Sequence, residues 1–162
     1  MRPILKLAIL AVAALVALPA SAATTTPVNF NVTAAVVKGC TVVAPSINFG
    51  NYDPSIVGTD TPAAAVNIQV KCTKGVIASV NKLTTANTFA MKSTTTGDLL
   101  SYKLYQDAGR TADWSAVAAP NQTAASSQTA LNFPVYGFIT ANQNVGVAAD
   151  YTDAVTVVVT FN

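Results

Sequence analysis

Side chains that could carry out catalysis are scarce in this sequence. Its 162 residues contain no histidine, and all seven acidic residues are aspartates, with no glutamate among them. Without an imidazole, the chain can build neither a Ser-His-Asp or Cys-His nucleophile nor a histidine-ligated metal site. The composition therefore excludes most hydrolytic mechanisms, and we do not expect an enzyme.

The aspartates are the remaining candidates for chemistry. Asp150 and Asp153 are close in sequence, and Asp98 and Asp107 flank one expected strand. Paired carboxylates can bind calcium or act in acid–base catalysis. No calcium-loop spacing is present, however, and aspartate is an ordinary turn residue in β proteins. We therefore expect no metal, no cofactor and no catalytic residue.

Aromatic side chains could alternatively form a platform on which sugars stack. At strand positions such side chains are more often core residues or cross-strand pairs, which is the interpretation we favour. The residues concerned are Trp114, Tyr102, Tyr105, Tyr136 and Tyr151.

The N-terminal segment predicts export. Arg2 and Lys6 precede an unbroken apolar run from Leu7 to Leu18, and a small-x-small sequence ends at Ala22. This order of basic, apolar and small residues is typical of a cleaved secretory signal. The run is shorter than the roughly 20 residues needed to cross a bilayer, so we expect no stable membrane span.

Export decides the state of the two cysteines. In an oxidising compartment, Cys40 and Cys72 are expected to form a structural disulfide. A metal or redox pair is disfavoured, because the spacing is not C-x-x-C and no histidine can complete a ligand set.

Removing the signal also balances the charge. The chain has nine Lys and Arg residues and seven aspartates, and Arg2 and Lys6 leave with residues 1–22. The mature chain is then formally neutral, and its basic residues are scattered. It has no basic patch of the kind that nucleic acid requires. Low net charge favours association with other protein surfaces.

The elements that must position these residues are predicted to be strands. Apolar residues alternate with polar ones through 66–72, 100–104, 131–135 and 155–161, and no helical period follows the signal. Turn-forming residues occur at 52–54, 59–62, 96–98 and 107–110, and 118–130 is expected to be a mobile loop. The pattern predicts an all-β fold and is consistent with a sandwich of immunoglobulin-like type, although periodicity does not determine which sandwich it is.

Both termini of the mature chain carry alternating apolar residues. The last expected strand reaches Phe161 and stops at Asn162, with nothing following to cover its edge. Two arrangements explain this pattern: the first and last strands pair within one molecule, or the first strand is donated to a neighbouring copy. The N-terminal residues on one face are Val28, Phe30, Val32, Ala34 and Val36, and the C-terminal ones are Val155, Val157, Val159 and Phe161.

A series of motifs extends over nearly the whole mature chain. By their order and spacing, the sequence resembles the spore coat protein U domain family, which includes the pilins of archaic (Csu-type) chaperone–usher pili. The motifs are Gly39-Cys40-Thr41-Val42, Ile47-Asn48-Phe49-Gly50-Asn51-Tyr52, Ile68-Gln69-Val70-Lys71-Cys72, Leu100 to Asp107 followed by Arg110 and Trp114, Val135-Tyr136-Gly137, and Tyr151 to Val157.

The resemblance implies an incomplete immunoglobulin-like sandwich that lacks its last strand and is completed by a donor strand from a neighbouring subunit. Residues 1–22 would be the signal peptide, 23–37 the donor-strand extension and 38–162 the pilin domain. Val28, Phe30, Val32, Ala34 and Val36 would be the donor side chains. Val155, Val157, Val159 and Phe161 would form one wall of the acceptor groove, and a chaperone would anchor the Asn162 carboxylate.

The resemblance also implies a function. The chain would be a structural subunit of a pilus on the cell surface, for adhesion or biofilm formation. Its partners would be identical or related pilins, a periplasmic chaperone and an outer-membrane usher. Two alternatives are a spore-coat or envelope protein of the same family, and a monomeric exported carbohydrate-binding module. The chain departs from the family pattern at Ala149-Asp150, where a glycine is frequent, and at 85–91, where an arginine is missing.

Overall fold

A computed structural model describes residues 26–56, 58–81, 83 and 89–162. The expected signal at 1–22 lies outside the described residues, as does most of the stretch 85–91. The chain divides into two units, Met1–Ala35 and Val36–Asn162. In the described part of the first unit, residues 26–35, no strand is formed and the side chains are exposed.

The second unit is built from β-strands, and its described residues contain no helix. Within the part of the chain that the structure describes, no helix is long and apolar enough to cross a membrane. The strands are β1 (Cys40–Val43), β2 (Thr61–Pro62), β3 (Val66–Cys72), β4 (Ile77–Val80), β5 (Phe89–Lys92), β6 (Leu99–Tyr105), β7 (Gln122–Thr123), β8 (Leu131–Ile139) and β9 (Val159–Phe161).

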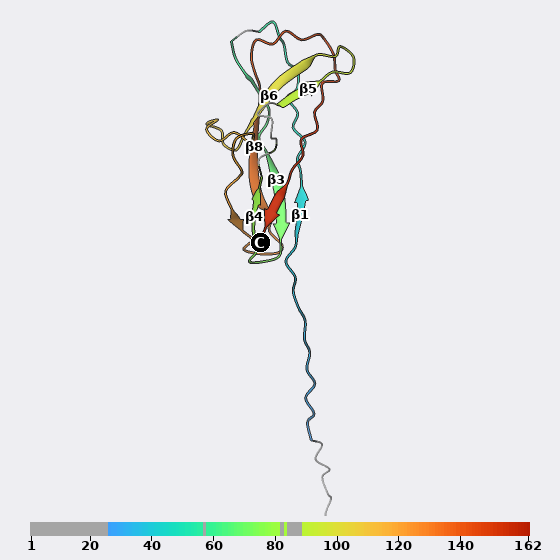
Figure 1. The fold of residues 1–162 in the computed structure, drawn as a ribbon, viewed down its shortest axis with the longest axis vertical. Helices are drawn as coiled ribbons and strands as arrows, with labels where there is room; N and C mark the ends of the chain where they lie inside the picture. The colour runs from blue at the N-terminus through green and yellow to red at the C-terminus, as the bar shows by residue number, and fades with distance from the viewer. Residues whose placement is uncertain (1–25, 57, 82, 84–88) are drawn as a thin grey trace, which may run out of the picture. The chain divides into compact units, whose positions relative to one another are not determined.

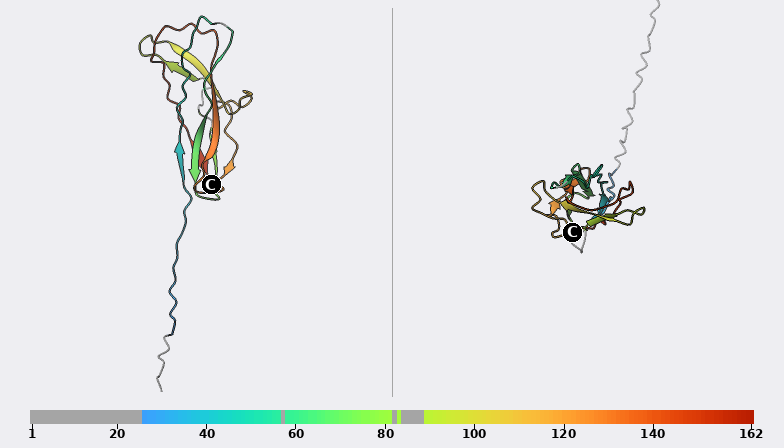
Figure 2. Two further views of the ribbon diagram at one scale, coloured as in Figure 1. Left: turned by 180° about the vertical axis from the view of Figure 1, so that it is seen from behind. Right: turned by 90° about the horizontal axis from the view of Figure 1, so that it is seen from above.

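These strands form two antiparallel sheets (Figure 1). The larger sheet has the order β1-β3-β8-β6-β5, with β2 also paired to β8, and the smaller one has the order β7-β4-β9. The succession of β1, β3 and β8 is visible from both sides of the unit (Figures 1 and 2). β1 and β9 are therefore edge strands, one in each sheet.

Alternating side chains explain why β3, β6 and β8 form the centre of the larger sheet. Along β3, Ile68, Val70 and Cys72 are buried while the residues between them are exposed. β6 and β8 alternate in the same way. Burial of one apolar face against the second layer supplies the driving force for this fold. The predicted strands at 66–72, 100–104 and 131–135 are confirmed, and β8 continues through Gly137 to Ile139.

The core contains two of the five aromatic residues considered as a sugar platform. Trp114 is fully buried, and its Nε1 donates a hydrogen bond to the Pro134 carbonyl at 3.1 Å. Tyr102 is buried as well, and its ring packs against Phe49 and Phe89 with centroids 5.6 and 5.3 Å apart. For these two residues the expected core role is confirmed.

The predicted disulfide between Cys40 and Cys72 is present. The two residues lie directly opposite each other in the β1–β3 ladder. The bond therefore fixes the start of β1 to the end of β3.

Two loop predictions were wrong in part. Within 118–130, β7 pairs with β4, and Ala119 and Ala124 are buried. These small side chains fit against the core without the alternation of larger apolar residues that the prediction required. Within 59–62, Thr61 and Pro62 pair with Ile139 and Phe138 of β8. A two-residue strand is too short to show a period in the sequence.

The last predicted strand is shorter than expected. Only Val159–Phe161 is a strand, although Val155, Val157 and Val159 are half-buried and the residues between them are exposed. Phe161 lies opposite Ala78, on the same face as Val159, and has an exposed fraction of 44% at the end of the strand. Residues 154–158 keep the alternation without forming a sheet ladder in the described part of the chain.

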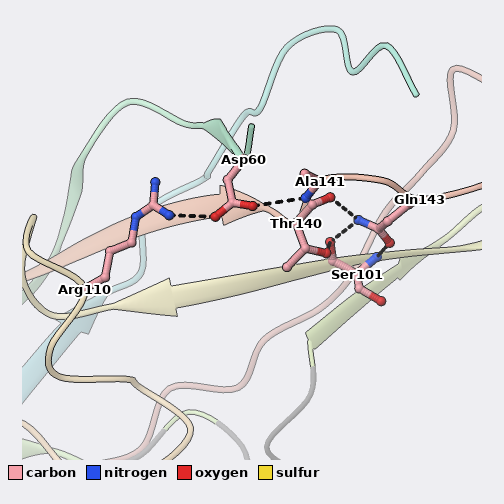
Figure 3. A network of polar contacts seen from close by, with 6 residues as sticks. All are labelled: Asp60, Ser101, Arg110, Thr140, Ala141 and Gln143. Atoms are coloured by element: carbon pink, nitrogen blue, oxygen red, sulfur yellow. Dashed lines mark hydrogen bonds and ion pairs between the residues drawn. The ribbon is translucent and has the colours of Figure 1, made fainter. Parts of the chain in front are cut away.

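A polar network fastens the connections around β2, β6 and β8 (Figure 3). Arg110 forms an ion pair of 2.6 Å with Asp60, which also accepts a hydrogen bond from the Ala141 amide at 3.0 Å. The Gln143 side-chain oxygen accepts a hydrogen bond from the Ser101 amide at 2.6 Å. Its side-chain nitrogen donates to the Ser101 and Thr140 carbonyls at 2.7 and 2.8 Å. This network fixes the chain where it leaves β8 toward the C-terminal segment.

Candidate functional site

An apolar groove lies in the second unit. Its first part has a volume of about 340 Å³ and lies between residues 44–49 and 151–157. Ile68, Leu104 and Val135 from three strands of the larger sheet form its floor. One wall therefore continues from β1, and the other leads into β9.

A second hollow extends the groove. It has a volume of about 480 Å³ and is lined by residues 47–52 on one side and 145–149 on the other. Ile47, Phe49, Met91 and Tyr151 line both parts. Because these side chains are shared, we treat the two hollows as one groove, and we call it the acceptor groove below.

The two walls are positioned differently. Residues 44–49 follow β1, and their side chains at Pro45, Ile47 and Phe49 point inward while those between are exposed. The opposite wall is attached to both sheets. Thr152 exchanges backbone hydrogen bonds with Lys92 of β5, and the Val158 carbonyl accepts the Asn81 amide just beyond β4. The segment between these two attachments spans the open side of the sandwich.

Unpaired backbone borders the groove. β1 has a partner only in β3, and β9 only in β4, among the strands that the structure describes. Segments 44–49 and 153–157, which line the groove, lie outside the described ladders, so the groove can accept an additional strand, with backbone hydrogen bonds along these segments and side chains in its hollows.

Phe49 fills a space left by a glycine. A Cβ at Gly137 of β8 would lie 2.9 Å from Cζ of Phe49 and 3.3 Å from Cγ2 of Ile47. Real Cβ atoms do not approach that closely, so the residue at 137 determines how deeply this wall can pack. Gly137 does not have a positive φ, so its role is to provide room.

Tyr102 provides a polar contact inside the groove. Its hydroxyl donates a hydrogen bond of 2.6 Å to Asp153 on the opposite wall. Burial raises the pKa of the Tyr102 phenol, and the hydrogen bond and negative charge of Asp153 raise it further. The phenol is therefore neutral at any physiological pH and holds the 151–157 wall to the floor.

Asp150 has a structural role at one end of this wall. It accepts hydrogen bonds from Ser93 Oγ at 2.7 Å, from Thr94 Oγ1 at 2.5 Å and from the Thr94 and Thr95 amides at 2.9 Å. These donors, the Thr94 and Ser93 hydroxyls first, lower the pKa of the Asp150 carboxyl. The residue that departs from the family pattern thus fastens the wall to the turn after β5.

The other candidate aspartates also serve turns. Asp98 accepts the Gly146 amide at 2.6 Å, and Asp107 accepts the Ala112 amide at 2.8 Å. The hydrogen bonds that Asp107 receives from the Ala112 and Thr111 amides lower the pKa of its carboxyl. No group of three or more His, Cys, Asp or Glu side chains that could hold a metal ion occurs among the described residues.

The residues predicted for the acceptor wall are divided between the groove and β9. Val155 and Val157 line the groove. Val159 packs half-buried against the core within β9, and Phe161 lies further along the same strand. Asn162 is exposed, and its amide donates to the Ile77 carbonyl of β4 at 3.1 Å.

The predicted donor residues are all exposed. The exposed fractions are 86% for Val28, 83% for Phe30, 81% for Val32 and 85% for Val36. Ala34 is exposed as well.

The groove wall at 44–49, which faces the wall at 151–157, was not predicted from the sequence. The alternation of Pro45, Ile47 and Phe49 was a signal that could have identified it.

Comparisons with known proteins agree with this architecture. The family model described as Spore Coat Protein U domain matches residues 26–158. "Protein U" of Myxococcus xanthus is 28% identical over 172 residues, which cover 95% of this chain and 95% of that protein.

A solved structure supports the fold. It is the complex of CsuC and CsuE, a chaperone and a tip adhesion subunit before assembly, from the archaic chaperone–usher Csu pili of Acinetobacter baumannii. The match has a TM-score of 0.50 and 22% identity, and it covers 76% of this chain but only 40% of the solved chain. Since the family model extends over most of the sequence, the chain belongs to the Spore Coat Protein U domain family.

Proposed function

We propose that this protein is an exported structural subunit of a pilus, joined to its neighbours by donor-strand exchange. Residues 23–37 of one copy would supply a strand to the acceptor groove of the next. Because the donor segment and the groove are different surfaces of the same chain, the contact is heterologous and repeats into a filament. Adhesion and biofilm formation would be the roles of that filament.

The observation that carries this proposal is the acceptor groove, open between the segment that continues from β1 and the segment that leads into β9. A strand placed there would complete the sandwich and satisfy the edge backbone. Its inward side chains would contact the floor at Ile68, Leu104 and Val135. No catalytic group is required for such a role.

The N-terminal segment has the pattern that such a groove selects. Val28, Phe30, Val32, Ala34 and Val36 alternate with polar residues, so all five can face one side of an extended strand. At about 1.5–3 kcal/mol for each buried side chain, they would contribute roughly 8–15 kcal/mol before the cost of ordering the strand. Dissociation of such a joint would be very slow.

Assembly would follow export. The segment 1–22 would direct secretion, and a periplasmic chaperone would occupy the groove until an outer-membrane usher exchanges it for the next donor strand. We propose that the chaperone anchors the carboxylate of Asn162, which lies exposed beside β4. The filament would then be displayed on the cell surface.

A coat or envelope protein that uses the same exchange is the second candidate. The near full-length match to "Protein U" favours it over unrelated classes. It differs from the first candidate in where the polymer is deposited. The carbohydrate-binding alternative loses support, because Trp114 and Tyr102 are buried and cannot present flat rings to a sugar.

The experiment compares the exported chain with a variant that lacks residues 24–36. Both are refolded and examined by size-exclusion chromatography and by electrophoresis without boiling. We expect ladders that resist detergent from the intact chain and none from the truncated one. If both are stable monomers, the proposed function is wrong.

A pair of point variants provides the matched control. Phe30→Asp places a charge on the apolar face of the donor segment, and Asn31→Asp places the same charge on its polar face. We expect the first to abolish the ladders and the second to keep them. Immunogold labelling of intact cells then separates a surface filament from a coat.

A further inference from the structure

Residues 37–39, which precede β1, are held in an extended conformation by hydrogen bonds from Thr73. The Thr73 amide donates to the Gly39 carbonyl at 2.9 Å, and the Thr73 hydroxyl donates to the Val37 carbonyl at 3.1 Å. The Cys40–Cys72 and Thr41–Lys71 pairs set the register of the β1–β3 ladder. Gly39 and Thr73 are the next pair in that register, so residues 37–39 continue the line of β1.

Without this attachment, the chain could close its own groove. A two-residue turn at Lys38 and Gly39 would fold residues 28–36 back along the free edge of β1. Val36 would then face Thr41, and Phe30 would face Ile47. Cross-strand partners share a face of the sheet, so Phe30 would point inward beside Ile47, as a donated strand requires. Thr41 lies on the exposed face with Lys71, so Val36 would point outward there, and self-closure would place Val28, Phe30 and Val32 in the groove opposite Phe49, Ile47 and Pro45.

The observed backbone opposes that turn. A type I′ hairpin turn requires positive φ at both central residues. The glycines with positive φ in the described chain are Gly50, Gly58, Gly75 and Gly97, and Gly39 is not one of them. A reversal would also move Val37 to the strand position beyond β1, about 4.8 Å further from β3, where Thr73 cannot reach its carbonyl.

The disulfide reinforces the attachment. Cys40 is bonded to Cys72, the residue next to Thr73. The start of β1 therefore cannot move away from β3 to accommodate a reversal, and Thr73 stays opposite Gly39. Val36 and Val37 remain exposed at 85% and 78%, which leaves their side chains free of this anchoring.

We propose that Thr73, positioned by the disulfide, keeps residues 37–39 extended and so excludes the chain's own donor strand from its groove, reserving the groove for a second copy. This inference rests on the proposed donor-strand exchange. Thr73 would thus favour polymerisation between molecules over closure of the groove within one molecule.

The test uses the double variant Lys38→Asn, Thr73→Val in the exported chain. It creates an Asn-Gly sequence at 38–39, which favours a type I′ turn, and removes the hydroxyl that holds Val37. We expect monomers with a closed groove, fewer ladders, and slower uptake of a fluorescent peptide of residues 26–37. Thr73→Val alone is expected to shift the balance toward monomer by roughly a factor of five, as for one ordinary hydrogen bond.

The matched control is Thr41→Val, in the same strand pair. Its hydroxyl donates to the Lys71 carbonyl at 3.4 Å and does not touch residues 37–39. We expect it to polymerise like the unmodified chain. Adding Phe30→Asp to the double variant should reopen the groove and restore peptide uptake, which distinguishes self-closure from misfolding.

The outcomes separate this inference from the proposed function. If the unmodified chain polymerises and the double variant polymerises equally well, the role of Thr73 is wrong while donor-strand exchange stands. If Phe30→Asp does not restore uptake in the double variant, self-closure is also wrong. An unmodified chain that neither polymerises nor takes up peptide overturns both proposals.

Discussion

At the residue scale, the depth of the acceptor groove depends on Gly137, whose lack of a side chain leaves room for Phe49. Phe49 occupies the space above Gly137 and contacts Tyr102 on the groove floor. This wall is not paired to another strand beyond β1 in the described structure. Its position is therefore set mainly by packing, and small changes in side-chain volume should displace it.

Gly137→Ala tests this dependence. The added Cβ would overlap the ring of Phe49, so we expect a loss of about 1–3 kcal/mol in the free energy of unfolding, as for other overpacked sites. Urea denaturation measures this loss, and uptake of the 26–37 peptide should weaken with it. The control is Gly39→Ala, whose Cβ would meet nothing within 4 Å. Equal effects of the two substitutions would contradict the packing argument.

Asp150 gives a second prediction at this scale, through pH. Its hydrogen bonds lower the folded-state pKa below the usual value of 3.8. As the pH falls below about 4, the unfolded chain takes up a proton at this carboxyl before the folded chain does, so the stabilisation that is complete at neutral pH is progressively lost. We expect the stability difference between the unmodified chain and Asp150→Asn to shrink as the pH falls from 4 toward 2.

Urea midpoints measured at a series of pH values check this behaviour. Above about pH 5 the difference should be constant, since the carboxyl is then ionised in both states. A difference that stays the same down to pH 2 would mean that Asp150 does not hold the Ser93–Thr95 turn in solution.

At the scale of elements, the groove is open because the backbone of its two walls is hydrogen-bonded to the sheets only near the ends of the walls. One wall leaves β1 at Val43, and β1 is bound to the sheet by β3 and the disulfide. The other wall is attached to β5 at Thr152 and to the residue after β4 at Val158. The stretches between these attachments have backbone groups available to a further strand.

Removal of the disulfide tests the anchoring of the first wall. The bond joins residues 32 positions apart. In the chain-entropy model, closing a loop of this size contributes about 3.7 kcal/mol to stability. We expect the double variant Cys40→Ala, Cys72→Ala to lose roughly 2–5 kcal/mol in urea denaturation and to bind the donor peptide more weakly. Unchanged peptide binding would show that β3 alone holds the wall.

At the scale of the whole molecule, the proposed filament would be held by apolar burial and backbone hydrogen bonds. The mature chain is expected to be neutral, with seven basic and seven acidic residues after position 22. Attraction between exposed charges is therefore not needed to join the subunits.

This view predicts that assembly is insensitive to salt. Raising the ionic strength from about 0.1 to 1 M shortens the screening length from about 10 to 3 Å, yet ladder formation should not fall. Urea should weaken assembly, because it solvates both apolar and peptide groups. Light scattering during refolding measures both effects. Assembly that collapses in salt would point to an electrostatic joint instead.

Much of the fold could be predicted from local pattern. The alternation in 66–72, 100–104 and 131–135 identified three strands, because burial on one face of a sheet demands apolar residues with period two. The disulfide followed from export and from the presence of only two cysteines. The loop prediction for 118–130 was wrong in part, since a small alanine such as Ala124 gives no signal of burial.

The groove could be predicted only in part. Val155 and Val157 were recognised by their alternation and do line it, whereas Phe161 lies in β9 and is partly exposed. The opposite wall at 44–49 was missed. Alternation reveals which side chains point inward, but it does not reveal which two segments lie across from each other.

From the sequence alone follow the limited chemistry and the class of fold: no histidine, alternating strands, one disulfide, and an apolar N-terminal segment that could pair within one molecule or between molecules. These are local properties, set by side-chain type and period. The folded structure was needed to locate the groove, to show how Gly137 admits Phe49, and to show that Thr73 holds residues 37–39 in line with β1. Those facts depend on contacts between residues far apart in the chain, and the folded backbone alone brings such residues together.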